Sequence, residues 1–293
     1  MPQTVLVIGA TGNYGQPVAW QLRQDGFDVR VFTRSRAKAE KIFGDTFPVF
    51  EGNINDDDSL RPALAGCYGV HINLRVLLKY GQSDDEIVHQ GTVNILRLAR
   101  EASVQRVTFL SFLFATPELS SFPHLKAKLD AEAAIRASGI PYAIFAPSVF
   151  MENARHLGKG KRIFLAKASP SSHPFRHVCA DDYARMVSRA YQLPQAPNKR
   201  FEVYGPEAIQ GDEAVRNYCA IVRPETRVYF FPHWLVALYL KLAGASILQH
   251  AIKMGNIHRQ MGEPGDPSQA DTSLGRATTT HREWCESERQ RLA

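Results

Sequence analysis

A glycine-rich turn near the N-terminus limits the fold of this chain more than any other feature of its sequence. The turn Gly9-Ala10-Thr11-Gly12-Asn13-Tyr14-Gly15 follows the β-branched run at 4–8 and precedes an amphipathic pattern at 14–25. Glycine permits a tight turn and lets backbone amides approach a phosphate, and the following helix N-terminus adds N–H groups and partial positive charge. A strand, this turn, a helix and a second strand ending near residue 33 form a unit that binds a dinucleotide pyrophosphate. We therefore expect Gly9, Thr11, Gly12, Asn13, Tyr14 and Gly15 to contact a dinucleotide; the alternative is an ordinary turn.

Short apolar runs alternate with helical patterns through the first half of the chain. Such alternation is typical of βαβ units with right-handed crossovers, and therefore of an α/β fold with a Rossmann-type, doubly wound parallel sheet. The expected strands are 4–8, 28–33, 47–51, 68–73, 106–110 and 141–146, and the expected helices are 14–25, 36–44, 57–65, 84–103 and 124–138.

The regular alternation ends near residue 150. Pro, Ser and His gather at 168–177, which indicates a connection, and a further strand is expected at 201–204 between helices at 181–192 and 207–222. The last sixty residues have helical and irregular patterns. We therefore expect a nucleotide-binding domain over 1–150 and a smaller, mostly helical C-terminal lobe over 151–293 that holds a substrate or partner.

Composition excludes several classes of protein. The 35 basic residues exceed the 29 acidic ones by only six, so no nucleic-acid partner is expected. The one basic cluster, over 159–167, is interpreted as a solvated loop or as a site that attracts an anionic substrate. The four cysteines form no metal-binding or disulfide pattern, which favours reduced thiols in the cytoplasm, and the histidines at 156, 173 and 177 suggest no metal site.

One apolar segment, 234–248, is too short to cross a bilayer. It has fifteen residues and includes Lys241 and Gly244, whereas a spanning helix needs about twenty apolar residues. We expect no membrane span, and interpret the segment as a helix packed on the protein body or in a homodimer interface. A helix lying in a membrane interface is the alternative.

The spacing of the three glycines resembles the short-chain dehydrogenase/reductase superfamily, and the wording GATGNYG is similar to its atypical, NmrA-like branch. The resemblance extends over about the first 150 residues, through the segments 52–60, 89–111 and 134–153, and matches the later lobe only loosely at 177–187. It implies a Rossmann fold and an NAD(P) cofactor.

The end of the second expected strand indicates which cofactor is preferred. Proteins that bind NAD commonly place an acidic residue here to hold the ribose hydroxyls. This chain instead has Thr33-Arg34-Ser35-Arg36, with Lys38 close behind. A guanidinium offers a planar set of donors suited to a 2′-phosphate. We therefore predict that NADP(H) is preferred over NAD(H) and that Arg34 binds the phosphate; alternatively, Arg36 and Lys38 only solvate the second helix.

The resemblance implies further cofactor contacts at the ends of the later strands. An acidic residue and its neighbour contact adenine in the related proteins, and the matching positions here are Asn53, which departs from the pattern but still offers an amide, and Ile54. Asn73 and Leu74 would pass near the nicotinamide ribose. The segment 145–150, with Pro147 and Val149, would lie near the nicotinamide.

Typical members of the superfamily use a serine after the fifth strand and a Tyr-x-x-x-Lys pair on the next helix. Ser111 and Lys128 match these positions, but His124 replaces the tyrosine. In one interpretation His124 is an acid or base beside Lys128, and Ser111 orients a carbonyl. In the other, Lys128 forms a surface ion pair with Glu132, or contacts the cofactor ribose, and His124 only begins the helix.

These features favour an NADPH-dependent oxidoreductase of the atypical, NmrA-like kind that acts on a small carbonyl, quinone or imine-like substrate. The missing tyrosine favours a second hypothesis, a non-catalytic NADP(H) sensor that regulates a protein partner. A sugar-nucleotide epimerase or dehydratase is a third hypothesis, although such enzymes normally need the tyrosine.

Overall fold

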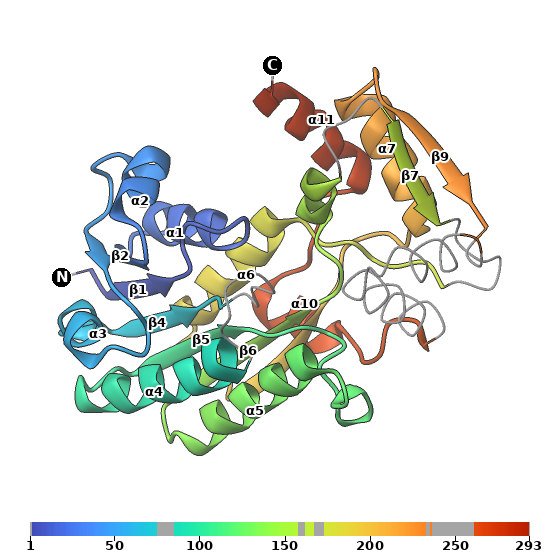
Figure 1. Cartoon of the computed structure of the whole chain (residues 1–293). Coiled ribbons are helices and arrows are strands. Elements are labelled where there is room, and N and C mark those ends of the chain that lie inside the picture. The colour runs from blue at the N-terminus through green and yellow to red at the C-terminus, as the bar shows by residue number, and fades with distance from the viewer. Residues whose placement is uncertain are drawn as a thin grey trace. The chain divides into compact units, whose positions relative to one another are not determined.

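The computed structural model describes residues 2–74, 85–157, 162–166, 173–232, 235 and 261–292 (Figure 1). The chain divides into two compact units. The first comprises Met1–Pro147, Ala180–Val203 and Asp266–Arg276, and the second comprises Ser148–Cys179, Tyr204–Gly265 and Ala277–Ala293.

A seven-stranded parallel sheet forms the centre of the first unit. The strand order is β3-β2-β1-β4-β5-β6-β8, so the order reverses between β1 and β4. The sequence-based prediction of a doubly wound parallel sheet is therefore confirmed. The strands are β1 (Thr4–Ile8), β2 (Asp28–Thr33), β3 (Val49–Glu51), β4 (Gly69–Ile72), β5 (Arg106–Leu110), β6 (Tyr142–Pro147) and β8 (Lys199–Val203).

Helices cover both faces of this sheet, and its central strands are buried on both sides. β4 and β5 are buried along their whole length. One core joins alternate residues of the sheet to four helices, α3, η1, α4 and α5. Figure 1 shows α4 and α5 along this face. The opposite residues, including Phe145, meet α6, which packs on α1. The helices of the unit are α1 (Gly15–Gln24), α2 (Arg36–Phe43), α3 (Asp57–Leu64), η1 (Asp85–Gln90), α4 (Gly91–Glu101), η2 (Pro117–Leu119), α5 (Pro123–Ala137), α6 (Ala180–Gln192) and α10 (Ser268–Leu274).

The structure differs from the sequence-based elements in two places of this unit. The single helix expected over 84–103 is a π-helix, η1, followed by α4. The strand expected at 201–204 is β8, which hydrogen-bonds to β6, and α6 packs on α1. Because of these contacts, residues 180–203 belong to the first unit, although the expected boundary near 150 placed them in the C-terminal lobe.

The second unit has a small core of its own. Its elements are η3 (Met151–His156), β7 (Arg162–Ala166), α7 (Gly211–Val222), β9 (Arg227–Phe231) and α11 (His281–Leu292). β7 and β9 form a two-stranded parallel sheet that the sequence analysis did not predict. Arg162 begins β7, so the loop expected over the basic cluster is wrong at that residue. The core consists of Met151, Ile163, Cys179, Tyr218, Cys219, Trp284 and Cys285.

Two further expectations concern cysteines and membrane segments. The four cysteines are buried and form no disulfide with one another, and burial raises the pKa of Cys67, Cys219 and Cys285. Within the described ranges, no helix is long and apolar enough to cross a membrane. The apolar segment 234–248 lies outside the described residues, apart from Leu235.

Candidate functional site

The glycine-rich turn packs against the chain that leaves β4. Gly9 has a φ of +82°, and a Cβ built on it would lie 2.0 Å from the carbonyl oxygen of Asn73. A Cβ on Gly15 would lie 2.3 Å from the carbonyl oxygen of Gly9. Both positions therefore require glycine. The structure thus brings together the turn and Asn73, two predicted parts of the cofactor site, where the strand order reverses and open parallel sheets bind their ligands.

The N-terminus of the helix after the turn is a candidate position for an anion. The Gly12 N–H donates to the Gly9 carbonyl oxygen at 3.1 Å, which closes the turn and leads directly into α1. No side chain caps α1 at Tyr14, and the first turn of the helix carries no acidic residue. The N-terminal N–H groups of α1 and the positive end of its dipole therefore fit a pyrophosphate.

The two arginines after β2 have different surroundings. The Arg36 guanidinium donates to the Val49 carbonyl oxygen at 2.8 Å, which commits it to the edge strand β3. Ser35 caps α2 by accepting from the Lys38 N–H at 3.2 Å. The Arg34 side chain is exposed, and no described residue forms a hydrogen bond or ion pair with it. Arg34 is therefore the guanidinium at this strand end that a bound phosphate can engage.

The residues after β3 form a tight polar loop. The Asn53 side-chain oxygen accepts from the Asn55 N–H at 3.1 Å, and the Asn53 N–H donates to the Ser59 hydroxyl at 3.2 Å. The carbonyl oxygen of Ile54 accepts from the Asn94 side chain at 2.8 Å. These bonds fix the loop, with Asn53 exposed and Ile54 half-buried.

Lys128 reaches from α5 to the C-terminal ends of two central strands. Its Nζ donates to the carbonyl oxygens of Leu74 at 3.1 Å and Leu110 at 2.5 Å. It also lies over the ring of Phe109, 4.7 Å from the ring centroid. Burial lowers the pKa of Lys128 to about 7 from 10.5, and the Glu132 carboxylate opposes part of this shift. An amine with this pKa can both donate and accept a proton at neutral pH.

Glu132 does not form the surface ion pair with Lys128 that the four-residue spacing suggested. Its carboxylate is buried, with a side chain only 1% exposed, and it is bound by Arg136 and Arg200. It also accepts a hydrogen bond from the Ser111 hydroxyl. The ion-pair alternative for Lys128 is therefore wrong, because Glu132 is directed into the protein by other partners.

His124 lies in the first turn of α5 and is half-buried, with its ring edge-on to Phe122 at a centroid distance of 6.1 Å. Lys128 hydrogen-bonds to backbone carbonyls and not to His124.

Pro147 ends β6 in the first unit, and its carbonyl oxygen accepts from the Leu113 N–H at 3.0 Å. Val149 belongs to the second unit, where its carbonyl oxygen accepts from the Val178 N–H at 2.9 Å.

His71, in the centre of β4, is a core residue. Its Nδ1 hydrogen-bonds to the Thr108 hydroxyl at 2.8 Å, and that hydroxyl hydrogen-bonds to the Tyr191 hydroxyl at 3.0 Å. Burial lowers the pKa of His71 to about 3. The imidazole is therefore neutral at physiological pH, and its Nδ1 is hydrogen-bonded within the core.

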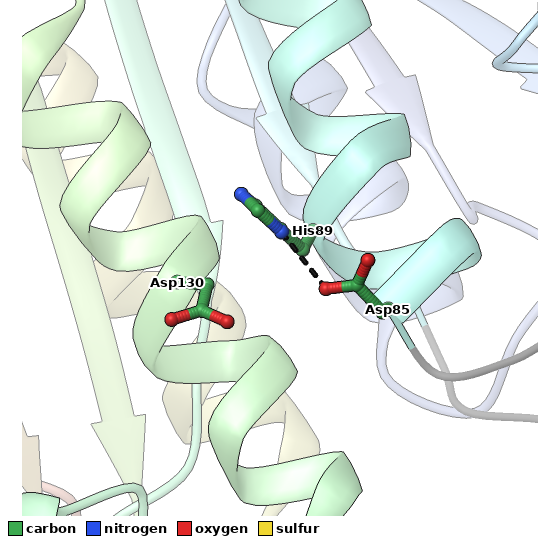
Figure 2. Close-up of side chains that lie close together, drawn as sticks. All are labelled: Asp85, His89 and Asp130. Atoms are coloured by element: carbon green, nitrogen blue, oxygen red, sulfur yellow. Dashed lines mark hydrogen bonds and ion pairs between the residues drawn. The ribbon is translucent and has the colours of Figure 1, made fainter.

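Three side chains that could ligate a metal ion, and that the sequence analysis did not single out, lie together between η1 and α5 (Figure 2). These are Asp85 and His89 of η1 and Asp130 of α5, whose candidate ligand atoms lie within 4.8 Å of one another. His89 Nδ1 hydrogen-bonds to Asp85 at 2.8 Å, and Lys126 pairs with Asp130 at 2.5 Å. In the sequence, the four-residue spacing of Asp85 and His89 was the feature that could have indicated this cluster. Since both carboxylates already have a local partner, these bonds explain the cluster without a metal ion.

The strand order and the glycine turn after β1 define a Rossmann-type fold. The sequence profile of the NmrA-like family matches residues 1–276, so the chain belongs to the NmrA-like family.

Individual relatives share only about a quarter of their residues with this chain over the aligned parts. The photosystem II assembly factor Ycf39 of Synechocystis is 25% identical over 218 residues, which cover 72% of this chain and 65% of that protein. The chain thus spans slightly less than two thirds of that relative. A (4-alkanoyl-5-oxo-2,5-dihydrofuran-3-yl)methyl phosphate reductase of Streptomyces griseus is 28% identical over 211 residues, with 71% of this chain and 70% of that protein covered.

Solved structures share the fold over nearly the whole chain. The triphenylmethane reductase of Citrobacter aligns with a TM-score of 0.75 at 18% identity and covers 98% of this chain and 99% of its own. The NADPH-dependent quinone oxidoreductase of Escherichia coli, in its complex with NADPH, aligns with a TM-score of 0.73 at 20% identity, over 97% and 99% of the two chains. At these identities the likeness concerns the fold.

Proposed function

We propose that this protein is an NADPH-dependent oxidoreductase that reduces a small carbonyl or quinone-like compound. The observation that carries the proposal is the Lys128 amine, whose pKa is about 7 and which two backbone carbonyls hold at the C-terminal ends of β4 and β5. The chain that leaves β4 packs on the glycine turn at Asn73. Reductase names among the relatives and structural neighbours agree with this reaction class.

The residues around the turn fit a nicotinamide dinucleotide. Gly9 and Gly15 keep the turn closely packed on Asn73 and on the start of α1, and a helix N-terminus after such a turn suits a pyrophosphate. The exposed Arg34 suits a 2′-phosphate, which favours NADPH over NADH. Further contacts are proposed from Asn53 and Ile54 to adenine, from Asn73 and Leu74 to the nicotinamide ribose, and from Pro147 and Val149 to the nicotinamide.

In this proposal Lys128 moves the proton. When NADPH is bound it supplies a hydride, and a carbonyl carbon that gains the hydride leaves negative charge on its oxygen. The Lys128 ammonium donates a proton to that oxygen and is protonated again from water. Lys128 is favoured over His124 because two backbone carbonyls hold it at the ends of the central strands. Its pKa of about 7 suits proton transfer near neutral pH.

Turnover measurements test this assignment. NADPH oxidation is followed against a panel of quinones, aldehydes and ketones for the wild type, Lys128→Met and His124→Phe. We expect Lys128→Met to lower kcat/KM by about 100-fold or more, as loss of a general acid typically does, and His124→Phe to change it by less than about threefold. The reverse pattern would assign the proton transfer to His124.

A non-catalytic NADP(H) sensor that regulates a protein partner is the second candidate. It is favoured by the absence of the tyrosine at position 124 and by the engagement of the Ser111 hydroxyl with Glu132. Tight NADPH binding by calorimetry, with no NADPH oxidation across the whole panel, would support the sensor and contradict the reductase.

A further inference from the structure

A buried carboxylate joins three parts of the first unit. Glu132 Oε1 accepts from the Ser111 hydroxyl and from Arg200 Nε, the latter at 3.2 Å. Glu132 Oε2 accepts from Arg136 Nη2 at 2.7 Å. A buried carboxylate is tolerated only when such charged and hydrogen-bonded partners compensate for its lost hydration. Because the partners come from the end of β5, from β8 and from α5 itself, the carboxylate fixes α5 relative to both strands.

Arg200 extends this connection to the backbone after β5. Its Nη2 donates to the carbonyl oxygens of Phe112 at 3.1 Å and Leu113 at 3.3 Å, and its Nη1 pairs with Glu202 at 2.6 Å. The segment 111–113 is thus hydrogen-bonded both to Arg200 and to Glu132, which also bind each other. The bonds leave this segment little freedom to shift along the helix.

α5 and the end of β5 also carry Lys128 and the Leu110 carbonyl oxygen to which it donates. Lys128 stands one turn before Glu132 on α5, and the Leu110 carbonyl that accepts from Lys128 directly precedes Ser111. A shift of α5 that moves Glu132 relative to Ser111 therefore also moves the backbone that carries Lys128 relative to the end of β5. The charged groups around Lys128 are Glu132 on its own helix, with Arg136 and Arg200 bound to that carboxylate; His71 on β4 is neutral.

We propose that Ser111 and Glu132 are positioning residues that hold Lys128 at the ends of the central strands, and that the Ser111 hydroxyl serves Glu132 and not the substrate. This inference rests on the proposed function only where turnover is the readout. Ser111 occupies the position of the serine that orients substrate in the superfamily this chain resembles. In this chain its hydroxyl is hydrogen-bonded to a buried carboxylate. The negative charge of Glu132 also acts on the amine and opposes part of the lowering of its pKa.

The first test reads the amine directly and needs no substrate. Lysine labelled with ¹³C at Cε is titrated by NMR in the wild type, Glu132→Gln and Arg136→Gln, with Lys128→Met to assign the signal. Removal of the carboxylate should lower the pKa of Lys128 by about 0.5 to 1 unit. Arg136 is 43% exposed, so Arg136→Gln should fold, and loss of its positive charge should raise the same pKa by a few tenths of a unit. Unchanged titration in folded Arg136→Gln and Glu132→Gln would overturn the role of Glu132.

Glu101→Gln is the matched control for that titration. Glu101 is also a helical glutamate paired with two arginines, Arg61 and Arg97, but on the exposed side of α4. The Glu101→Gln substitution should leave the pKa of Lys128 unchanged. A shift equal to that of Glu132→Gln would show a general charge effect and contradict the proposal.

The second test separates positioning from substrate contact at Ser111. Ser111→Ala should lower kcat by about threefold to tenfold, with little change in KM, and Ser111→Thr should restore it by returning the hydroxyl. Loss of one donor to a substrate oxyanion typically costs 100-fold or more. A loss of that size in Ser111→Ala, with an unchanged Lys128 titration, would place the hydroxyl on the substrate and overturn the proposal. If the wild type turns over no substrate, the proposed function fails while the NMR titration still decides the role of Glu132.

Discussion

Replacing Lys128 by methionine should remove a large part of the pH dependence of folding above neutrality. The pKa of this amine is about 7 in the folded chain and 10.5 when unperturbed. Between these two values the unfolded chain holds a proton that the folded chain has lost, so the free energy of unfolding rises with pH. The slope is about 1.4 kcal/mol per pH unit, and for Lys128 it sums to about 2.5 kcal/mol between pH 7.5 and 9.5.

The assay is urea unfolding of the wild type and Lys128→Met at pH 7.5, 8.5 and 9.5. The hydrogen bonds lost at the carbonyls of Leu74 and Leu110 shift the variant by the same amount at each pH, so they cancel when slopes are compared. Lys126→Met is the control, because Lys126 lies on the same helix but is exposed and paired with Asp130, which raises its pKa. If the wild type and Lys128→Met gave parallel lines over this range, the depressed pKa of Lys128 and its role as proton carrier would both be refuted.

Three further predictions follow from the structure. Gly9→Ala should weaken NADPH binding by tenfold or more in calorimetry, since its Cβ would lie 2.0 Å from the Asn73 carbonyl oxygen; unchanged affinity would contradict the close approach. Arg34→Ala should weaken NADPH binding by about tenfold to 100-fold and NADH binding by much less, and equal losses would refute the 2′-phosphate contact. Burial lowers the pKa of His177 from 6.5 to about 4, so the folded chain loses about 3 kcal/mol of stability as pH falls between these values. Urea unfolding of His177→Gln should lack that loss, and an identical acid dependence would show that His177 does not cause it.

Much of the first unit follows from local patterns. The strands 4–8, 28–33 and 106–110 have the same bounds in sequence and structure, because short β-branched runs between glycine turns and helices leave few other possibilities. The π-helix before α4 was not visible, since apolar spacing alone does not distinguish it from an α-helix. The pair β7 and β9 was missed because each strand is stabilised by a partner about sixty residues away.

The candidate site could be predicted only where one stretch of chain determines it. The glycine turn carries its own geometry, and Lys128 was selected by its position after Ser111 and His124. The partners of Glu132 were not predictable, because Arg200 is 68 residues further along the chain and reaches the carboxylate only after β8 joins the sheet. The four-residue spacing of Lys128 and Glu132 therefore suggested an ion pair, whereas in the folded chain Glu132 pairs with Arg136 and Arg200.

The division of the chain has a consequence for dissecting the protein. Because β8 borders β6, a fragment ending near residue 150 would leave the β6 edge without hydrogen-bond partners and would uncover the face that α6 protects. The smallest piece that retains every strand of the sheet ends at residue 203 and must carry 148–179 with it. Recombination that exchanged the second unit between relatives would therefore need several coordinated breakpoints, since that unit is built from three separate stretches of the chain.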